Sequence, residues 1–276
     1  MKKRNEKAPR GLGMTAGEKR GTIPFTDGGL PLADLHAHPE GGTIEAIVAL
    51  SQECGVKFGM VEHAGTKENV VYPGLLSCDA DLIRWTSSLE GKGVYKGVQA
   101  EWTDWSGCFS QEALATLDYV LMDALTFPGP NGRRVLLWEK DAEIGEDPER
   151  FMDRYVDWHV EILTAQPIDI LANVSYIPEK FGDAYEALWS PARLERVIQA
   201  LLRAGVAMEI NSGFRLPRMS FLRVAKEAGV KFCFGSNARY PNMGLLDYPL
   251  EMARTLGLSA SDMWLPGANG PRACRG

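Results

Sequence analysis

A unit made of an amphipathic helix, a glycine, a valine and a short apolar run recurs along this chain of 276 residues. It is found around Gly55, Gly205 and Gly229, in ALSQECGVKFGMVEH, ALLRAGVAMEINSG and VAKEAGVKFCFGSNA. Glycine accepts the left-handed backbone conformation that ends many helices, and the apolar run after it has the length of a buried strand. Helices joined through short loops to buried strands are typical of a parallel sheet covered by helices.

The same pattern predicts further elements. Additional buried strands are expected at 95–102, 118–125 and 168–177. The expected helices cover residues 43–54, 79–90, 111–116, 148–165, 191–204, 217–228 and 246–256. The turn-rich stretch FPGPNGRR (127–134) interrupts the alternation and leads into a hairpin at 134–139. The alternation and the chain length together predict an α/β fold with a single barrel-like domain.

The barrel is expected to cover residues 30–265, after a basic arm at 1–29 and before a short tail at 266–276. Residues 1–20 contain seven Lys or Arg and two Glu, and they include no apolar run. That composition predicts a solvated arm, with nucleic-acid contact as the minor alternative.

The composition of the chain argues against nucleic acid and membranes as binding partners. The net charge of −6 gives no general attraction to nucleic acid or to anionic membranes. No apolar run approaches the roughly 18 residues that a membrane helix needs. The five cysteines are scattered without a Cys-x-x-Cys pair, which indicates a reducing compartment and predicts a cytoplasmic protein. We expect a small-molecule partner.

Polar residues cluster where the predicted strands end. They are His36, His38, Glu62, His63, Gln99, Glu101, Asp123, Asn173, Glu209, Asn211, Ser236 and Asn237. The carboxyl ends of parallel barrel strands converge on one face, where active sites form. His36 and His38 are two apart on a strand and therefore share a side, so both imidazoles can approach one metal ion.

Several stretches resemble the PHP family, the polymerase-and-histidinol-phosphatase barrels of metal-dependent phosphoesterases. The resemblance covers about residues 32–265. It is carried by DLHAHPEGGTIEAIVALSQECGVKFGMVEHAG, GVQAEW, DYVLMDAL, DILANVSYIP, VAMEINSG and FGSNARYPNMG. It implies a distorted TIM-like (β/α)7 barrel, up to three Zn, Mn or Fe ions, and attack on phosphorus by metal-bound hydroxide. His36, His38 and His63 match the family's metal histidines, and Glu40 lies near an early ligand position.

The chain departs from the family at five matched positions. Gln99 stands where the family has a bridging Glu, and Leu125 and Asn173 stand where it has histidines. Asn237 and Arg239 replace its final Asp and His. Amides are poor ligands for transition metals and leucine is none, so the full cluster cannot assemble. We expect at most one divalent ion, held by His36 and His38 with Glu40, Glu101 or Glu209, and His63 nearby.

The other polar residues have two interpretations each. Glu101 and Asp123 are both candidate general acids. Alternatively, Glu101 forms a salt bridge at the strand end, and Asp123 is a metal ligand shifted from the position that Leu125 occupies. Arg239 suits a phosphate or carboxylate, or else pairs with Glu101 or Glu62. Gln99, Asn173 and Asn237 are expected to face the substrate beside it.

Three hypotheses follow for function. The first is a PHP-like hydrolase that acts on a small phosphoester with a reduced metal site. The second is a non-catalytic barrel that binds a small anionic ligand or a partner in the barrel mouth, the face where the carboxyl ends of the strands converge. The third is an amidohydrolase-like enzyme, because those barrels also open with His-x-His and GLSASDMWLPGANGPRA resembles their C-terminal helix.

Overall fold

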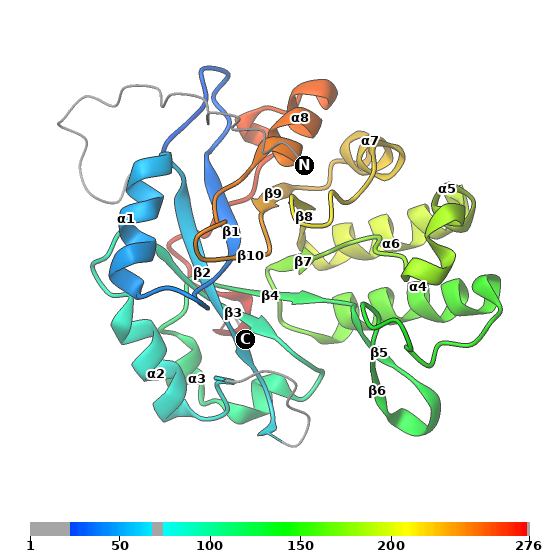
Figure 1. Ribbon diagram of the computed structural model, residues 1–276, viewed down its shortest axis with the longest axis horizontal. Coiled ribbons are helices and arrows are strands. Elements are labelled where there is room, and N and C mark those ends of the chain that lie inside the picture. Colours follow the sequence, from blue (N-terminus) through cyan, green and yellow to red (C-terminus); the bar gives the residue numbers. More distant parts are fainter. Residues whose placement is uncertain (1–22, 68–73, 275–276) are drawn as a thin grey trace, which may run out of the picture.

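A computed structural model describes residues 23–67 and 74–274, and in that part of the chain a curled sheet of eight strands forms the centre (Figure 1). Its strands are β1 (Ala33–His38), β2 (Lys57–Ala64), β3 (Tyr95–Ala100), β4 (Tyr119–Asp123), β7 (Ile170–Ala172), β8 (Ala207–Asn211), β9 (Phe232–Gly235) and β10 (Ala238–Arg239). Their order is β10-β1-β2-β3-β4-β7-β8-β9, and the neighbours in this sheet are parallel.

The two ends of the sheet meet through β9 and β10. Only two residues separate these strands, and while β9 pairs with β8, β10 pairs with β1 at Ala37 and His38. The last segment of the barrel therefore lies between β8 and β1, which makes a distorted TIM-like barrel. The predicted α/β barrel class is confirmed.

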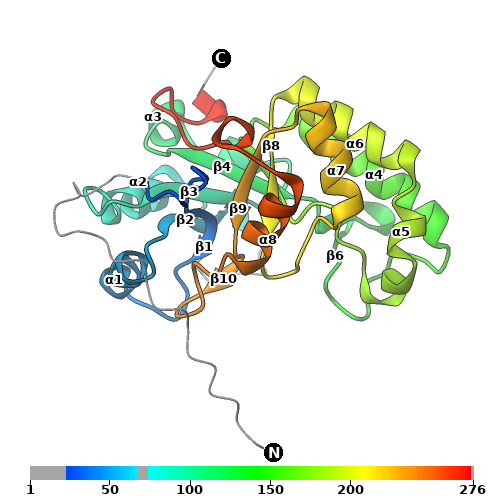
Figure 2. The ribbon, with the colours of Figure 1, turned by 90° about the horizontal axis from the view of Figure 1, so that it is seen from above.

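Helices cover the outside of the curled sheet (Figure 2). They are α1 (Ile44–Cys54), α2 (Asp79–Ser88), α3 (Gln111–Leu114), α4 (Pro148–Ala165), α5 (Tyr185–Leu188), α6 (Pro191–Ala204), α7 (Met219–Ala228) and α8 (Asp247–Leu256). Gly55, Gly205 and Gly229 end their helices in the left-handed conformation, at φ 65°, 62° and 86°. The recurring helix–glycine–strand unit of the sequence is confirmed.

Short 3-10 helices lie in the connections, at η2 (Trp105–Cys108), η3 (Pro130–Gly132), η4 (Glu179–Ala184), η5 (Ala260–Asp262) and η6 (Arg272–Cys274). The predicted 168–177 strand is shorter than expected, because Asn173 and Ser175 leave the extended conformation at φ 49° and 71°. The hairpin begins earlier than expected, since β5 (Thr126–Pro128) pairs antiparallel with β6 (Arg134–Leu136). The C-terminal stretch thought to resemble an amidohydrolase helix forms η5, irregular chain and η6 instead.

The barrel interior holds a small apolar core of its own. Tyr119 of β4 fills its centre, fully buried, and its hydroxyl donates to the Leu35 carbonyl oxygen at 2.8 Å. Gly59 and Gly97 on the two preceding strands leave room for this ring, because a Cβ at either would overlap it. The polar residues described below lie beyond this core, toward the carboxyl ends of the strands.

The basic arm is a prediction that falls mostly on residues 1–22, outside the described part of the chain. The described tail residues lie against the sheet, where the backbone N–H of Arg272 donates to Asp169. Of the helices in residues 23–67 and 74–274, none is long and apolar enough to cross a bilayer.

Candidate functional site

Three of the four histidines meet at the carboxyl ends of β1 and β2. The ring centroids of His36 and His38 are 5.1 Å apart, and the His38 ring stacks on His63 at 4.8 Å and 17°. Their exposed fractions are 1% for His36 and His38 and 2% for His63. The expectation that His36 and His38 share one side of their strand is confirmed.

His36 is held by two partners within the protein. Its Nδ1 lies 2.7 Å from Oε1 of Glu209, and its Nε2 lies 3.1 Å from Oε1 of Gln99. Burial disfavours a charged imidazole, but the Glu209 carboxylate outweighs it and raises the pKa of His36 above its ordinary value. Burial likewise opposes the charge on Glu209, and the same pairing brings the pKa of that carboxyl below its ordinary value.

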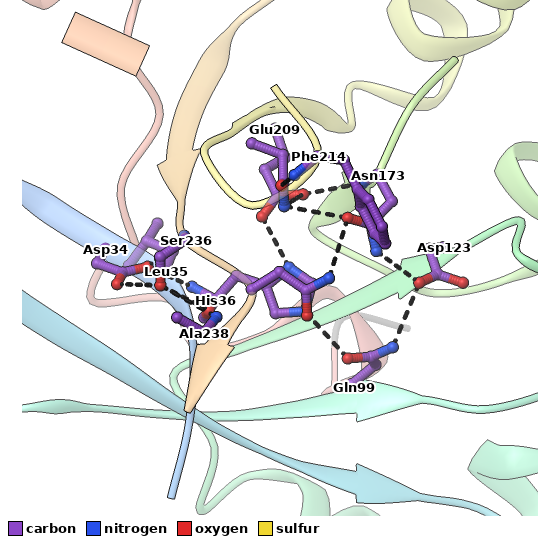
Figure 3. A network of polar contacts seen from close by, with 12 residues as sticks. Asp34, Leu35, His36, Gln99, Asp123, Asn173, Glu209, Phe214, Ser236 and Ala238 are labelled. Atoms are coloured by element: carbon purple, nitrogen blue, oxygen red, sulfur yellow. Dashed lines mark hydrogen bonds and ion pairs between the residues drawn. The ribbon is translucent and has the colours of Figure 1, made fainter. Parts of the chain in front are cut away.

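Amide side chains extend this contact across the mouth (Figure 3). The Gln99 and Asn173 amides donate to Oδ2 of Asp123 at 3.3 and 2.8 Å. Asn211 donates to the Asn173 side-chain oxygen and to Oε2 of Glu209, both at 3.0 Å. The network therefore joins residues from β1, β3, β4, β8 and the loop after β7.

Asp123 is the buried carboxylate of this group. Burial, together with the nearby Glu101 carboxylate, raises its pKa to about 6. Its other oxygen accepts the backbone N–H of Leu125 at 3.0 Å. A carboxyl group that is partly protonated near neutral pH is suited to give a proton to a leaving group.

His38 lies at the centre of the three histidines and has a different environment from His36. Neither of its ring nitrogens has a hydrogen bond of normal geometry within the described residues, although the Asn237 side chain lies close enough to affect it. Burial lowers the pKa of His38 well below its ordinary value, and the neighbouring His36 adds to this effect. His38 is therefore a neutral imidazole with lone-pair capacity at the mouth.

A pocket of about 190 Å³ opens above these residues. Its polar floor and rim consist of His38, His63, Gln99, Asp123, Asn173, Asn237 and Arg239. Leu125, Trp138 and Phe214 form an apolar wall. Drug-sized ligands occupy pockets of about 300–1,000 Å³, so this pocket suits a smaller molecule.

Arg239 and Glu40 form an ion pair at the rim. Nε of Arg239 donates to Oε2 of Glu40 at 2.5 Å, and both side chains are partly exposed, at 43% and 38%. The guanidinium pairs with neither Glu62 nor Glu101, the two partners considered from the sequence. Glu40 thus meets Arg239 rather than the histidines.

Glu101 also lies outside the pocket floor. Its Oε1 is 2.5 Å from Nδ1 of His63, and it lines a neighbouring pocket of about 290 Å³ beside the β5–β6 hairpin. This contact fixes the orientation of the His63 ring. Glu101 therefore acts on the mouth through His63.

The backbone is strained at two pocket residues. Asn173 and Asn237 adopt positive φ angles of 49° and 52°. Asparagine tolerates this conformation better than most residues, and such strain is found preferentially at functional sites.

Sequence reasoning missed part of the site. Trp138 and Phe214 were not singled out, and the sequence gives no signal for them except that both are large apolar residues in turn-rich segments. The aromatic residues that follow Glu101 in the sequence lie elsewhere: Trp105 and Phe109 are buried in the core, and Trp102 packs on Trp158. Fully buried His159 packs against Tyr155 and Trp189, away from the mouth.

The donor set does not fit a transition metal in this arrangement. The described residues contain no group of three or more His, Cys, Asp and Glu side chains placed to hold one ion. Both nitrogens of His36 face acceptors, Glu40 pairs with Arg239, and Nδ1 of His63 contacts Glu101. His38 offers two nitrogens without a hydrogen bond to the part of the chain that the structure describes. A catalytic zinc site needs about three protein ligands.

Comparison with known proteins shows which fold this chain shares but does not show its family. No family model and no curated protein sequence matches the chain. The structure is similar to that of a histidinol phosphate phosphatase from Lactococcus lactis subsp. lactis, complexed with zinc, L-histidinol and phosphate. The identity is 16% and the TM-score 0.54, over 81% of this chain and 91% of the other.

A weaker similarity links the chain to an HpcH/HpaI aldolase from Desulfitobacterium hafniense, with 14% identity and a TM-score of 0.39, over 87% of this chain and 95% of the other. At these identities the likeness shows a shared fold. Membership of the PHP family stays a prediction.

Proposed function

We propose that the barrel mouth binds and hydrolyses a small anionic molecule of the phosphoester class, as a PHP-like hydrolase. The observation that carries this proposal is the pocket at the strand ends, which joins Arg239 to His38 and Asp123. Active sites of parallel barrels lie at this end. The fold shared with a phosphatase agrees with the proposal.

Five polar residues of the pocket have chemical tasks in this proposal. Arg239 holds the anionic group, and the amides of Asn173 and Asn237 orient it. Neutral His38 takes a proton from the attacking water as its oxygen bonds to phosphorus. Asp123 gives its proton to the ester oxygen that leaves, so one P–O bond forms and one breaks.

The test is phosphate release from a panel of small phosphoesters by the full-length chain. The Asp123→Asn variant is expected to lower kcat by about 100-fold, because it cannot give the proton. Asp157→Asn is the matched control, since that carboxylate lies on α4 and pairs with exposed Arg196. Wild-type activity is expected to fall as the pH rises through about 6, where Asp123 loses its proton.

Two results would contradict this assignment. One is the absence of turnover across the panel, with or without added zinc or manganese. The other is an Asp123→Asn variant as active as Asp157→Asn.

The second candidate is a barrel that binds a small anion without turning it over. It is favoured by the network around His36, in which polar groups of the mouth satisfy one another. Calorimetry with inorganic phosphate separates the two. Binding that needs Arg239, without release from any ester, favours the non-catalytic barrel.

A further inference from the structure

The hydrogen bonds of the mouth close on themselves. Starting at His36, they run through Gln99, Asp123, Asn173, Asn211 and Glu209 and return to His36. This circuit is here called the mouth ring, and Figure 3 labels all of its members except Asn211. We propose that the mouth ring, with a proton-bearing His36 as its cation, takes the place of a transition-metal centre in this barrel.

Every contact of the mouth ring can have a donor on one side and an acceptor on the other. Above pH 6 the Asp123 carboxylate is largely ionised and only accepts, so it fixes both neighbouring amides with their NH2 groups toward it. The Gln99 oxygen must then face Nε2 of His36, at 3.1 Å. Glu209 accepts from the other ring nitrogen at 2.7 Å, so both nitrogens of His36 carry hydrogen.

The surrounding carboxylates also favour a positive charge on His36. Two buried carboxylates, Glu209 and Asp123, face His36 from opposite sides of the mouth ring, and neutral His38 lies next to it. An imidazolium in this position supplies the positive charge that a metal ion supplies elsewhere.

The amides explain why an ion is not needed. A metal site requires lone pairs that converge on one point. The Gln99, Asn173 and Asn211 amides each aim an NH2 group into the mouth ring, where a carboxylate or imidazole ligand would present a lone pair. Two of the five positions that depart from the family pattern, Gln99 and Asn173, are thus members of the circuit.

The contact between His36 and Glu209 also occurs in metal sites, so an experiment has to distinguish the two cases. Histidine ligands often donate their second ring nitrogen to a carboxylate, as His36 does to Glu209. What distinguishes the two cases is the state of Nε2, which carries a proton in the mouth ring and a metal ion in a metal site.

The first measurement is ¹⁵N NMR of the imidazoles in the full-length chain at pH 7.5, before and after addition of zinc. His36→Gln identifies the resonances. We expect both His36 nitrogens to be protonated and their shifts to stay unchanged with zinc. One unprotonated nitrogen, or a zinc-dependent shift of Nε2, would overturn the proposal.

The second measurement uses Gln99→Glu, which replaces the amide by a carboxylate of the same shape. Elemental analysis after zinc loading and desalting should find less than about 0.1 ion per wild-type chain, and calorimetry should find zinc affinity about tenfold higher in the variant. Gln99→Asn, also an amide, is the control and should gain nothing. A stoichiometric ion in wild type, or no gain in Gln99→Glu, contradicts the role given to the amide.

This inference concerns the site of the proposed hydrolase but does not need turnover. Protonation and metal content are read without substrate, so a chain that hydrolyses nothing can still confirm the mouth ring. Conversely, phosphate release by a zinc-loaded enzyme would support the function and refute the mouth ring.

Discussion

The Asp34 carboxylate accepts two hydrogen bonds from Ser236, one from its backbone N–H at 2.8 Å and one from its hydroxyl at 2.6 Å. The two residues lie 202 positions apart, at the start of β1 and just after β9. Asp34 also accepts the backbone N–H of Gly244 at 2.8 Å. This buried carboxylate therefore fastens the last segment of the barrel to the first strand.

Ser236→Ala should loosen that connection. The change removes the hydroxyl donor and leaves the buried Asp34 oxygen without one of its hydrogen bonds, which costs about 1–3 kcal/mol of unfolding free energy. Urea denaturation followed by fluorescence measures the loss. Ser87→Ala on the exposed side of α2 is the control and should change stability by less than about 0.5 kcal/mol. Equal stabilities would show that Asp34 gains nothing from the hydroxyl.

Gly235→Ala should disturb the contact between Glu209 and His36 in the mouth. A Cβ at Gly235 would overlap the Glu209 carboxylate and lie 2.7 Å from Cβ of His36. We expect a loss of about 1–3 kcal/mol and a displaced His36 resonance, because the pair has to move apart. Gly182→Ala, where a Cβ meets nothing within 4 Å, is the matched control. A variant with wild-type stability and an unshifted His36 signal would contradict the close packing.

The rim ion pair predicts opposite effects for its two members. Arg239→Gln should weaken phosphate binding by about tenfold, because the guanidinium is the cation at the pocket rim. Glu40→Gln should strengthen it by a few-fold, about 0.5–1 kcal/mol, since Arg239 no longer has a competing carboxylate. Isothermal calorimetry measures both, with exposed Arg254→Gln as the control. Weaker binding in Glu40→Gln would place Glu40 among the ligand contacts instead.

His159 should make the fold sensitive to mild acid. Burial lowers its pKa from 6.5 to about 4 in the folded state, where Nδ1–H donates to the Tyr155 carbonyl oxygen. Between these values the unfolded chain binds a proton that the folded chain does not. The free energy of unfolding therefore falls as the pH drops from about 6.5 to 4, by roughly 3 kcal/mol from this residue.

Urea denaturation at a series of pH values tests this sign. His159→Phe cannot titrate, so its stability should depend less steeply on pH over the same range. Parallel curves for the two proteins would show that His159 titrates normally in the fold.

Much of the fold could be predicted because its signals are local. The glycines at 55, 205 and 229 mark helix ends that backbone geometry requires. The strand after α4 was overextended because Asn173 and Ser175 adopt left-handed conformations that hydrophobicity does not reveal. The closure through β10 was also out of reach, since two residues pairing with β1 leave no periodic pattern.

The sequence predicted where the site lies but not which side chains within it form hydrogen bonds or ion pairs with one another. His38, His63, Gln99, Asp123, Asn173, Asn237 and Arg239 line one pocket, as the convergence of parallel strand ends requires. Which polar group bonds to which depends on side-chain directions across the barrel, so the pairing of Arg239 with Glu40 was not foreseen. The contact of Glu209 with His36 arises in the same way, between residues 173 positions apart.

Part of the pocket wall lies outside the barrel strands, whereas much of the pocket floor is built on them. Trp138 follows β6 in the excursion between β4 and α4, whereas His38, Gln99 and Asp123 are on barrel strands. Changes in the length or sequence of that excursion can alter which molecule fits while leaving the barrel's folding and proton-handling residues untouched. Natural variants of this barrel can therefore diversify in ligand choice through one external segment, at little risk to the inherited scaffold.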